Sequence, residues 1–398
     1  MKLLKRTWAD VSLDNLAHNY TVLRRQVPAA CRFLGVVKAD AYGHGAVPVS
    51  HHLEELGAEF LAVSNLEEAV QLRRAEVRRP ILILGYTPAQ YARELAEMDL
   101  RQEVHSLAYA RELETRLLGA RSRLRVHLKL DTGMARLGFF CQEGEQVLEE
   151  LLAVTRMPHL QVEGMFTHFP VADSLDPSDE AFTREQFRLF QGFVAGMESA
   201  GVRPEICHCC NSGATIAYPE FAMDMVRPGV ATYGIAPSQD LAGRLPLRPL
   251  LTLQTTISQI RAYPAGVPVS YGRTYVTPTP KVLAVVSIGY ADGLSRQLSG
   301  RVSFLLRGKQ VPVVGRICMD MCMVDVTEVP EAREGDLVTV LGTGGNGAPS
   351  ACGLAAQLGT IPYEILCSIS KRIPRIYLDG KKRTEICLLY TSPSPRDA

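Results

Sequence analysis

The sequence has few cysteines, almost no net charge and no long apolar run, and each shortage excludes a class of protein. Ten cysteines in 398 residues are far below the density of small disulfide-stabilised secreted domains. The 43 basic residues balance 42 acidic ones, so nothing favours nucleic acid or an acidic membrane surface as a partner. No stretch approaches the roughly 18 apolar residues of a membrane span, and the start lacks the apolar segment of a signal peptide. We therefore expect a cytoplasmic protein that does not bind membranes.

What the sequence does contain is material for a large core. Its residues are 46% hydrophobic and 21% charged, which excludes a disordered or collagen-like chain. At about 150 residues per domain, the length predicts two or three domains, or one barrel with a further domain attached.

The first part of the chain alternates between short apolar runs and helical patterns. Residues 13–27 have helical spacing of apolar side chains, residues 64–67 (SNLE) form a capping-box pattern that begins another helix, and residues 183–200 form a long one. The predicted strands are residues 33–37, 60–63, 80–85, 99–105, 124–130, 160–167, 205–209 and 223–226. Repeated βα units predict an α/β fold with a (β/α)₈ TIM barrel over residues 11–236. An open doubly wound sheet stays the alternative, since periodicity does not show closure.

The composition changes near residue 237, where prolines predict a linker. Beyond it, residues 251–258, 282–287, 302–306 and 336–341 are apolar runs rich in Thr, Val and Ile with a period of two. This pattern predicts a mostly β domain over residues 237–385, together with residues 1–10. Residues 386–398 fit neither pattern and resemble a translated sequencing adapter, so we expect a non-native tail.

Four predicted strands end in cationic or basic side chains, and active sites of barrels lie at that edge. Lys38 follows residues 33–37, Arg136 lies in the loop after residues 124–130, His168 follows residues 160–167, and Arg227 follows residues 223–226. Each alone has an ordinary explanation, such as a lysine reaching water or a core histidine. Together they favour an anionic ligand, and Ser212 before a predicted helix is suited to a phosphate.

Two other clusters are less informative alone. Residues 207–210 (CHCC) are contiguous, and adjacent strand residues point to opposite faces, so we expect no metal site there. In the β domain, Tyr271, Tyr290 and Tyr363 lie near Gly or Pro turns, and residues 315–321 read GRICMDM. Tyrosines are often core residues with one polar end, so these motifs by themselves identify no reaction.

Taken in order, the motifs VVKADAYGHG, KLDTGMARLG, THF, NSGA, VRPGVATYG, SYGRT, IGYADG, GRICMDM and IPYEIL resemble those of alanine racemase, from about residue 7 to residue 377. The resemblance implies a barrel that binds pyridoxal phosphate, a β-rich C-terminal domain and a head-to-tail homodimer that shares its active sites. It also implies an isomerase that interconverts L- and D-alanine and supplies D-alanine for peptidoglycan.

The resemblance also assigns roles to residues. Lys38 would hold pyridoxal phosphate as a Schiff base, and Tyr271 would act as the second catalytic base across the dimer interface. Arg227 would face the pyridine nitrogen with His168 behind it, and Asp320 would lie beside the site. The phosphate would be surrounded by Ser212, the amides of Gly229 and Val230, Tyr42 and Tyr363. The substrate carboxylate would meet Arg136 and the Met319 amide; Lys129, which steadies Arg136, is a candidate for carbamylation; and Tyr290 and Tyr363 would line the entrance.

Chemistry supports the two bases, because racemisation removes a proton from one face of the α-carbon and returns one to the other. Lysine and tyrosine ordinarily have pKa values of about 10.4 and 10, so neighbouring cations and desolvation must lower them. Arg227, whose ordinary pKa exceeds 12, keeps its proton and so leaves the ring a weaker electron sink, which disfavours transamination.

Three alternatives remain open. One is a racemase of broader specificity or for serine, against which Tyr363 favours a small substrate. The second is a diamino-acid decarboxylase on the same barrel, and the third is a non-catalytic pyridoxal-phosphate-binding protein. The SYGRT motif and the whole β domain argue against these last two.

Overall fold

The computed structural model describes residues 6–343, 347–380 and 382–386. The chain divides into two compact units. The barrel unit comprises residues 17–41 and 46–247, and the β unit comprises the described residues within Met1–Leu16, Tyr42–Gly45 and Arg248–Ala398. The predicted non-native tail, residues 386–398, lies outside the described residues except for residue 386.

The barrel unit contains the predicted parallel strands, and each lies within two residues of its predicted position. They are mostly buried because helices cover a parallel sheet on its outer face. Most are apolar, but residues 100–104 and 124–131 also carry polar side chains. The strands, in the order in which they pair, are β10 (Met225–Val226), β2 (Arg32–Val36), β3 (Phe60–Val63), β4 (Ile81–Ile83), β5 (Leu100–Val104), β6 (Leu124–Asp131), β8 (Leu160–Phe166) and β9 (Ile206–His208), with β7 (Phe139–Phe140) paired to β6.

Backbone hydrogen bonds join the two ends of this order. The Asp224 amide donates to the Cys207 carbonyl at 3.0 Å, and the Arg227 amide donates to the Cys210 carbonyl at 2.8 Å. The first and last strands of the path are therefore neighbours. The sheet closes, and of the two predicted architectures the (β/α)₈ barrel is confirmed.

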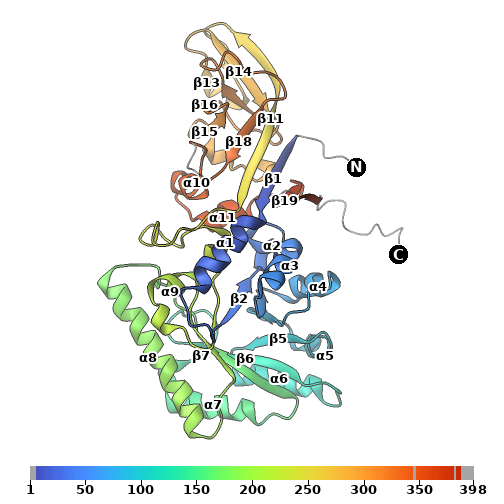
Figure 1. Ribbon diagram of the computed structural model, residues 1–398, viewed down its shortest axis with the longest axis vertical. Helices are drawn as coiled ribbons and strands as arrows, with labels where there is room; N and C mark the ends of the chain where they lie inside the picture. The colour runs from blue at the N-terminus through green and yellow to red at the C-terminus, as the bar shows by residue number, and fades with distance from the viewer. Residues whose placement is uncertain (1–5, 344–346, 381, 387–398) are drawn as a thin grey trace. The chain divides into compact units, whose positions relative to one another are not determined.

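Helices follow most strands and surround the barrel (Figure 1). The helix predicted at residues 183–200 begins earlier, because Asp176 caps it and Pro177 occupies its first turn. The helices are α1 (Leu13–Arg24), α3 (Ala46–Leu56), α4 (Leu66–Arg74), α5 (Ala92–Glu97), α6 (Leu107–Leu117), α7 (Glu145–Thr155), α8 (Pro177–Ser199) and α9 (Ser212–Ala217), with short 3₁₀ turns at Ala89–Tyr91, Cys141–Glu143, Pro219–Phe221 and Val230–Tyr233.

The cap of α4 corrects the predicted capping box. The side chain of Asn65, not Ser64, accepts the Glu68 amide, at 3.0 Å, and the Glu68 carboxylate accepts the Ser64 amide at 2.7 Å. Ser64–Glu67 and Asn65–Glu68 both fit the pattern of a capping residue followed three positions later by glutamate. The helix begins one residue later than the sequence pattern predicts.

The segment after β2 has an unusual backbone. The helical element α2 (Lys38–Tyr42) is a left-handed turn, in which Ala39, Asp40 and Ala41 have φ values of 52, 54 and 53°. L-residues rarely adopt this conformation, and it costs free energy at each position. The Asp40 carboxylate stabilises the turn by accepting the Ala46 amide at 2.8 Å. Lys38 is the first residue of this turn and lies just after the end of β2.

The β unit is built on one large, mostly antiparallel sheet. The pairing of β11 with β14 closes β14, β17, β16, β15, β18 and β11 into a ring, and β1, β19 and β20 extend it from β11. The strands are β1 (Thr7–Ser12), β11 (Leu251–Tyr263), β14 (Lys281–Val286), β15 (Ser303–Leu306), β16 (Lys309–Val314), β17 (Cys322–Asp325), β18 (Leu337–Leu341), β19 (Arg375–Asp379) and β20 (Lys382–Ile386), with a separate hairpin of β12 (Pro268–Val269) and β13 (Tyr275–Val276).

Short elements complete the β unit. Helices α10 (Ala351–Leu358) and α11 (Pro362–Cys367) follow β18, and 3₁₀ turns lie at Tyr271–Arg273, Tyr290–Asp292 and Arg296–Leu298. The fully buried Arg375 donates to the Gly43 carbonyl at 3.0 and 3.2 Å, and so anchors residues 42–45 in this unit. Across the part of the chain that the structure describes, no helix is long and apolar enough to span a membrane.

Candidate active site

The barrel unit gathers cationic groups at the carboxyl ends of its strands. Lys38 follows β2, and Lys129 lies two residues before the end of β6. Arg136 lies in the loop after β6, and Arg227 follows β10. Burial lowers the pKa of His168 well below its usual value, and the positive charges of Arg227, Arg136, Lys38 and Lys129 lower it further. The structure therefore brings these predicted residues into one electrostatic neighbourhood, with a neutral histidine among them.

Arg227 is the most constrained of these residues. It is 4% exposed. One guanidinium nitrogen, Nη1, donates to His208 Nδ1 at 2.9 Å, and the other, Nη2, donates to the carbonyl oxygens of Thr167 at 2.8 Å and Cys209 at 3.1 Å and to His168 Nδ1 at 3.3 Å. Burial lowers the pKa of Arg227 to about 10, so the group stays charged at neutral pH while all these partners are uncharged.

The loop that carries Arg136 is organised by Asp131. The Asp131 carboxylate accepts the amides of Gly133 at 3.0 Å, Ala135 at 3.1 Å and Arg136 at 3.2 Å. Burial lowers the pKa of Lys129 to about 8, with Arg136 and Arg227 contributing to the decrease. An appreciable fraction of the Lys129 amine is therefore neutral near pH 8, and the Arg136 side chain is exposed.

Ser212 organises the predicted phosphate site. Its hydroxyl accepts the Gly229 amide at 2.8 Å and the Ala231 amide at 3.3 Å. Asn211 caps α9 by accepting the Ala214 amide at 3.0 Å. Ser212, Gly229 and Val230 are buried and lie together, as the sequence predicts.

The remaining predicted residues belong to the β unit. Tyr42 packs against Tyr363 with ring centroids 5.9 Å apart, and burial raises the pKa of the Tyr42 phenol. Tyr271 is 69% exposed, and Tyr290 and Met319 are also exposed. Asp320 accepts Arg372 Nη2 at 2.7 Å.

Two backbone turns of the β unit fit closely together. The Tyr290 amide donates to the Cys318 carbonyl and the Ala291 amide to the Met319 carbonyl, both at 3.0 Å. A Cβ on Gly289 would lie 2.3 Å from each of these two carbonyl oxygens, so only glycine fits there. We call residues 289–293 and 318–321 the paired turns; they place Tyr290, Met319 and Asp320 on one framework.

Sequence reasoning missed the buried residues that are linked to Arg227 by hydrogen bonds. His127 and His208 are buried polar residues, and Glu163 is nearly so. A signal was present in β6, where LRVHLKLD alternates apolar and polar residues over its whole length. In a closed barrel this alternation directs every second side chain inward.

For residues 207–210 (CHCC), no cluster of three or more metal-ligand side chains occurs among the described residues.

The donors of the barrel unit fit pyridoxal phosphate. An amine at a strand end suits an aldehyde, a buried guanidinium hydrogen-bonded to carbonyl oxygens and imidazole nitrogens suits a neutral ring nitrogen, and a serine beside the Gly229 and Ala231 amides suits a phosphate. The fold and this set of side chains define a barrel enzyme that uses pyridoxal phosphate.

Comparison with known proteins identifies the family. Residues 11–237 match the model for the N-terminal domain of alanine racemase, and residues 250–377 match that for its C-terminal domain. Alanine racemase of Desulfosudis oleivorans is 43% identical over 380 residues, which cover 94% of this chain and 97% of the relative. That of Desulfovibrio desulfuricans is 42% identical over 372 residues, covering 94% and 98%.

Solved structures agree. Alanine racemase of Clostridium difficile 630 superposes with a TM-score of 0.92 at 36% identity, covering 98% of this chain and 100% of that one. The Bacillus anthracis structure with bound L-Ala-P has a TM-score of 0.91 at 36% identity, covering 98% and 99%. The chain belongs to the alanine racemase family, whose members are isomerases that depend on pyridoxal phosphate.

Proposed function

We propose that this chain interconverts L-alanine and D-alanine with pyridoxal phosphate and so supplies D-alanine for peptidoglycan. The observation that carries the proposal is the setting of Arg227, a charged and buried guanidinium hydrogen-bonded to carbonyl oxygens and neutral imidazoles, at the end of a barrel strand. A guanidinium donates hydrogen bonds but does not release its proton at neutral pH. Facing a pyridine nitrogen, it binds the ring without protonating it.

The barrel unit supplies the cofactor site. Lys38 provides the amine that binds the aldehyde, and His168, kept neutral by its surroundings, accepts from Arg227 at 3.3 Å. Ser212, Gly229 and Val230 would hold the phosphate, with Tyr42 and Tyr363 as its further contacts. The hydroxyl of Ser212 already gathers the amides of this segment, which supports that role.

Two bases move the proton. Pyridoxal phosphate, when bound, withdraws electrons from the α-carbon of alanine and so makes its proton acidic. Lys38 serves the face that gives D-alanine and Tyr271 the face that gives L-alanine. Tyr271 lies in a tight turn, between Ser270 at φ 64° and Gly272 at φ 70°.

Arg136 and the Met319 amide bind the substrate carboxylate, while Tyr290 and Tyr363 limit the size of the entrance and Asp320 lies beside it. Carbamylation of Lys129 would give Arg136 an anionic partner. The lowered pKa of Lys129, about 8, supports this modification, because only the neutral amine reacts with carbon dioxide.

The active enzyme is a homodimer in which Tyr271 completes the partner's site. A groove of about 390 Å³ lies beside Tyr271, lined largely by apolar side chains that include Val269, Leu283 and Met323. Met321, which also lines the groove, and Met319 are both exposed. An exposed apolar surface of this kind favours a protein partner, and a second copy is the occupant that we propose.

Two further assignments belong to the proposal. The domains are residues 11–236 and residues 237–385 with 1–10, as the sequence predicts. The location is the cytoplasm: all nine described cysteines are free thiols, as expected in a reducing compartment.

A chiral assay tests the function. The full chain with added pyridoxal phosphate is given L-alanine, L-serine or L-lysine, and enantiomers, pyruvate and decarboxylation products are measured over time. We expect D-alanine to appear fastest with little pyruvate. A faster reaction with serine would indicate a different specificity, and no product from any substrate would refute the proposal. Sedimentation of the same sample should show a dimer; an active monomer would refute the shared site.

A further inference from the structure

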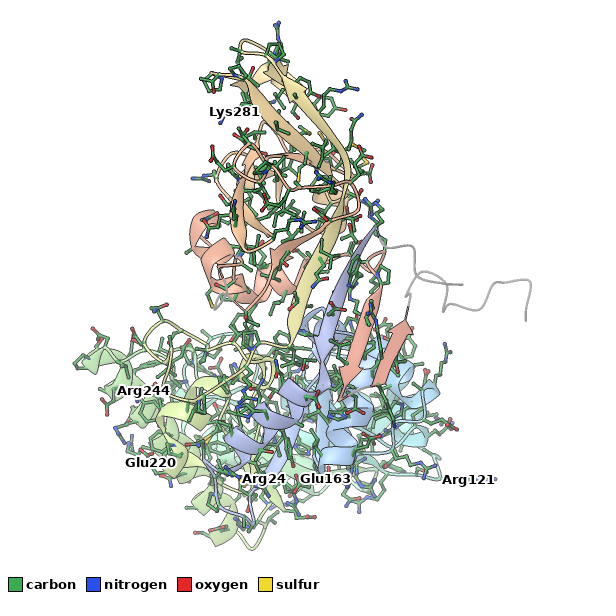
Figure 2. The ribbon with its side chains drawn as sticks, turned by 45° about the horizontal axis from the view of Figure 1, so that its top comes forward. Arg24, Arg121, Glu163, Glu220, Arg244 and Lys281 are labelled. Atoms are coloured by element: carbon green, nitrogen blue, oxygen red, sulfur yellow. The ribbon has the colours of Figure 1, made fainter. Side chains whose placement is uncertain are left out.

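A line of buried polar side chains crosses the inside of the barrel from Arg227. His208 Nδ1 accepts from Arg227 at 2.9 Å, and His208 Nε2 lies 2.9 Å from His127 Nδ1. His127 Nε2 lies 3.2 Å from Glu163 Oε2, which also accepts Arg101 Nε at 3.0 Å. Glu163 is labelled in the barrel unit in Figure 2. We call Arg227, His208, His127, Glu163 and Arg101 the barrel relay.

The direction of every hydrogen bond in the relay follows from its first member. A guanidinium can only donate, so His208 Nδ1 must be bare and its proton must lie on Nε2. His208 Nε2 then donates to His127 Nδ1, which places the proton of His127 on Nε2. That proton points to a carboxylate, which can only accept when ionised. A single tautomer of each imidazole, protonated on Nε2, satisfies all these hydrogen bonds.

The charges agree with this direction. Burial lowers the pKa of His127 and of His208, so both rings are neutral. Burial alone would raise the pKa of Glu163, but the bonds from His127 and Arg101 outweigh it and lower the pKa to about 2. Two neutral rings thus connect the Arg227 cation to the Glu163 anion, which is also paired with the Arg101 cation.

Packing keeps the rings in this orientation. Phe166 stacks on His208, with centroids 4.9 Å apart and planes at 6°, and Phe60 meets His127 at 6.3 Å and 63°. A Cβ on Gly164 would lie 2.4 Å from His127 Nδ1. Gly164 faces His127 where the pairing of β6 and β8 shifts register, so the strand backbone itself makes room for the ring.

We propose that Glu163 is a positioning residue that holds the Arg227 guanidinium in one orientation through His127 and His208. The proposal rests on the proposed function in one respect, that Arg227 faces the cofactor ring. The relay determines which N–H groups of Arg227 donate hydrogen bonds within the protein. The guanidinium would therefore already be oriented before the cofactor binds.

The first test measures the tautomers directly. In holoenzyme labelled with ¹⁵N-histidine, NMR should show His127 and His208 protonated on Nε2 alone, unchanged from about pH 6 to 9, a range that includes the ordinary pKa of histidine, about 6.5. Protonation of either ring on Nδ1 would overturn the proposal. This measurement needs no catalysis, so it holds even if the alanine assay fails.

The second test compares Glu163→Gln with Glu114→Gln. Glu114 is a matched control, because it also pairs with a histidine, His159 Nδ1 at 2.5 Å, and its side chain is 16% exposed against 11% for Glu163. A neutral acceptor roughly halves the strength of the bond from His127. Glu163→Gln should move the His127 and His208 nitrogen signals and the absorption band of bound pyridoxal phosphate.

Kinetics provide the last readout. We expect kcat of Glu163→Gln to fall by about fivefold to tenfold, the size expected for losing about half of one charge-assisted bond, with little change in KM because the carboxylate of alanine is bound elsewhere. Glu114→Gln should alter neither the spectra nor kcat. Equal behaviour of the two variants would overturn the proposal. If Glu163→Gln does not fold, the tautomers of the unmodified enzyme still decide it.

Discussion

The two units differ in how they present their proposed active-site residues. In the barrel unit, Arg227 is 4% exposed and hydrogen-bonded at both terminal nitrogens, and Ser212 is buried among amides. In the β unit, Tyr271 is 69% exposed and Met319 is 53% exposed. The barrel residues are therefore held by contacts within their own unit, whereas these side chains of the β unit are exposed.

The β unit nevertheless fixes its residues, but through the backbone. The paired turns hold the main chain at Tyr290 and Met319 by two hydrogen bonds of 3.0 Å, while the side chains remain outside. Fixing the backbone of an exposed loop prepares it to meet a partner at low entropic cost. The difference teaches that the barrel unit fixes its proposed residues through side-chain contacts, whereas the β unit fixes the backbone and leaves the side chains exposed.

The largest expected effect separates catalysis from folding at Tyr271. Tyr271→Phe removes only an exposed hydroxyl, so the free energy of unfolding should change by less than about 0.5 kcal/mol. Exchange of the α-proton of L-alanine in deuterated water should fall by about 10³-fold, since the base for that face is lost. Exchange from D-alanine, which uses Lys38, should persist. Undiminished L-alanine exchange would exclude Tyr271 as the base.

Arg227→Glu should affect both catalysis and stability, because the residue is buried. A carboxylate there would face the Thr167 and Cys209 carbonyl oxygens, so we expect a loss of about 3–5 kcal/mol, as for other unpaired buried charges. In the folded fraction, a carboxylic acid can protonate the ring nitrogen, and pyruvate should increase relative to racemisation. Pyruvate measured beside D-alanine, with Arg227→Lys as the control, checks this; an unchanged ratio would contradict our account of selectivity.

The sequence predicted the framework better than the details of the site. Most of the barrel strands could be located because they are short, continuous apolar runs, as is usual for buried parallel strands. The relay could not, because His127 and Glu163 are 36 residues apart in sequence and meet at 3.2 Å only through the pairing of β6 with β8. Arg227 meets His208 only because the barrel closes between β10 and β9. The start of α4 was ambiguous for a local reason: Ser64 and Asn65 are both good caps, and the packing of the helix selects one.

Residues 42–45 show a further limit of sequence reasoning. Tyr42 follows a barrel strand closely in sequence, yet its segment groups with the β unit, where Gly43 accepts from Arg375 and the His44 carbonyl accepts the Tyr377 hydroxyl at 2.9 Å. These partners lie more than three hundred residues away in sequence. No local pattern predicts such a pairing.

A smaller effect tests the framework of the paired turns. The Asp292 side chain is fully buried and accepts Arg372 Nε at 2.7 Å, Arg6 Nη2 at 3.1 Å and the Gly289 amide at 2.9 Å. Asp292→Asn removes the charge but keeps the shape, so we expect a loss of about 3 kcal/mol, near the low end for a broken buried ion pair. KM for alanine should increase more than kcat falls, because the Met319 amide shifts.

Asp336→Asn is the matched control for that variant. Asp336 also pairs with an arginine in the β unit, Arg307 at 2.7 Å, but at the surface. Exposed pairs contribute about 0–1 kcal/mol. Urea unfolding followed by the fluorescence of Trp8, the chain's single tryptophan, which lies in β1, reports on this unit. Equal losses for the two aspartate variants would contradict the framework role of Asp292.

The smallest effect concerns acid and returns to the barrel unit. The pKa of Glu163 is lowered to about 2 in the folded chain, against about 4.3 when unfolded. Its contribution to stability is therefore fully present above about pH 4.3 and is lost as the pH falls toward 2, by at most about 1.4 kcal/mol per pH unit. Glu163→Gln lacks this component, so its stability should fall less steeply over that range. Helical circular dichroism follows the barrel unit, and the difference between the two curves cancels all other carboxylates. Parallel curves would show that Glu163 titrates as an ordinary glutamate, and the barrel relay would then lack its stabilised anion.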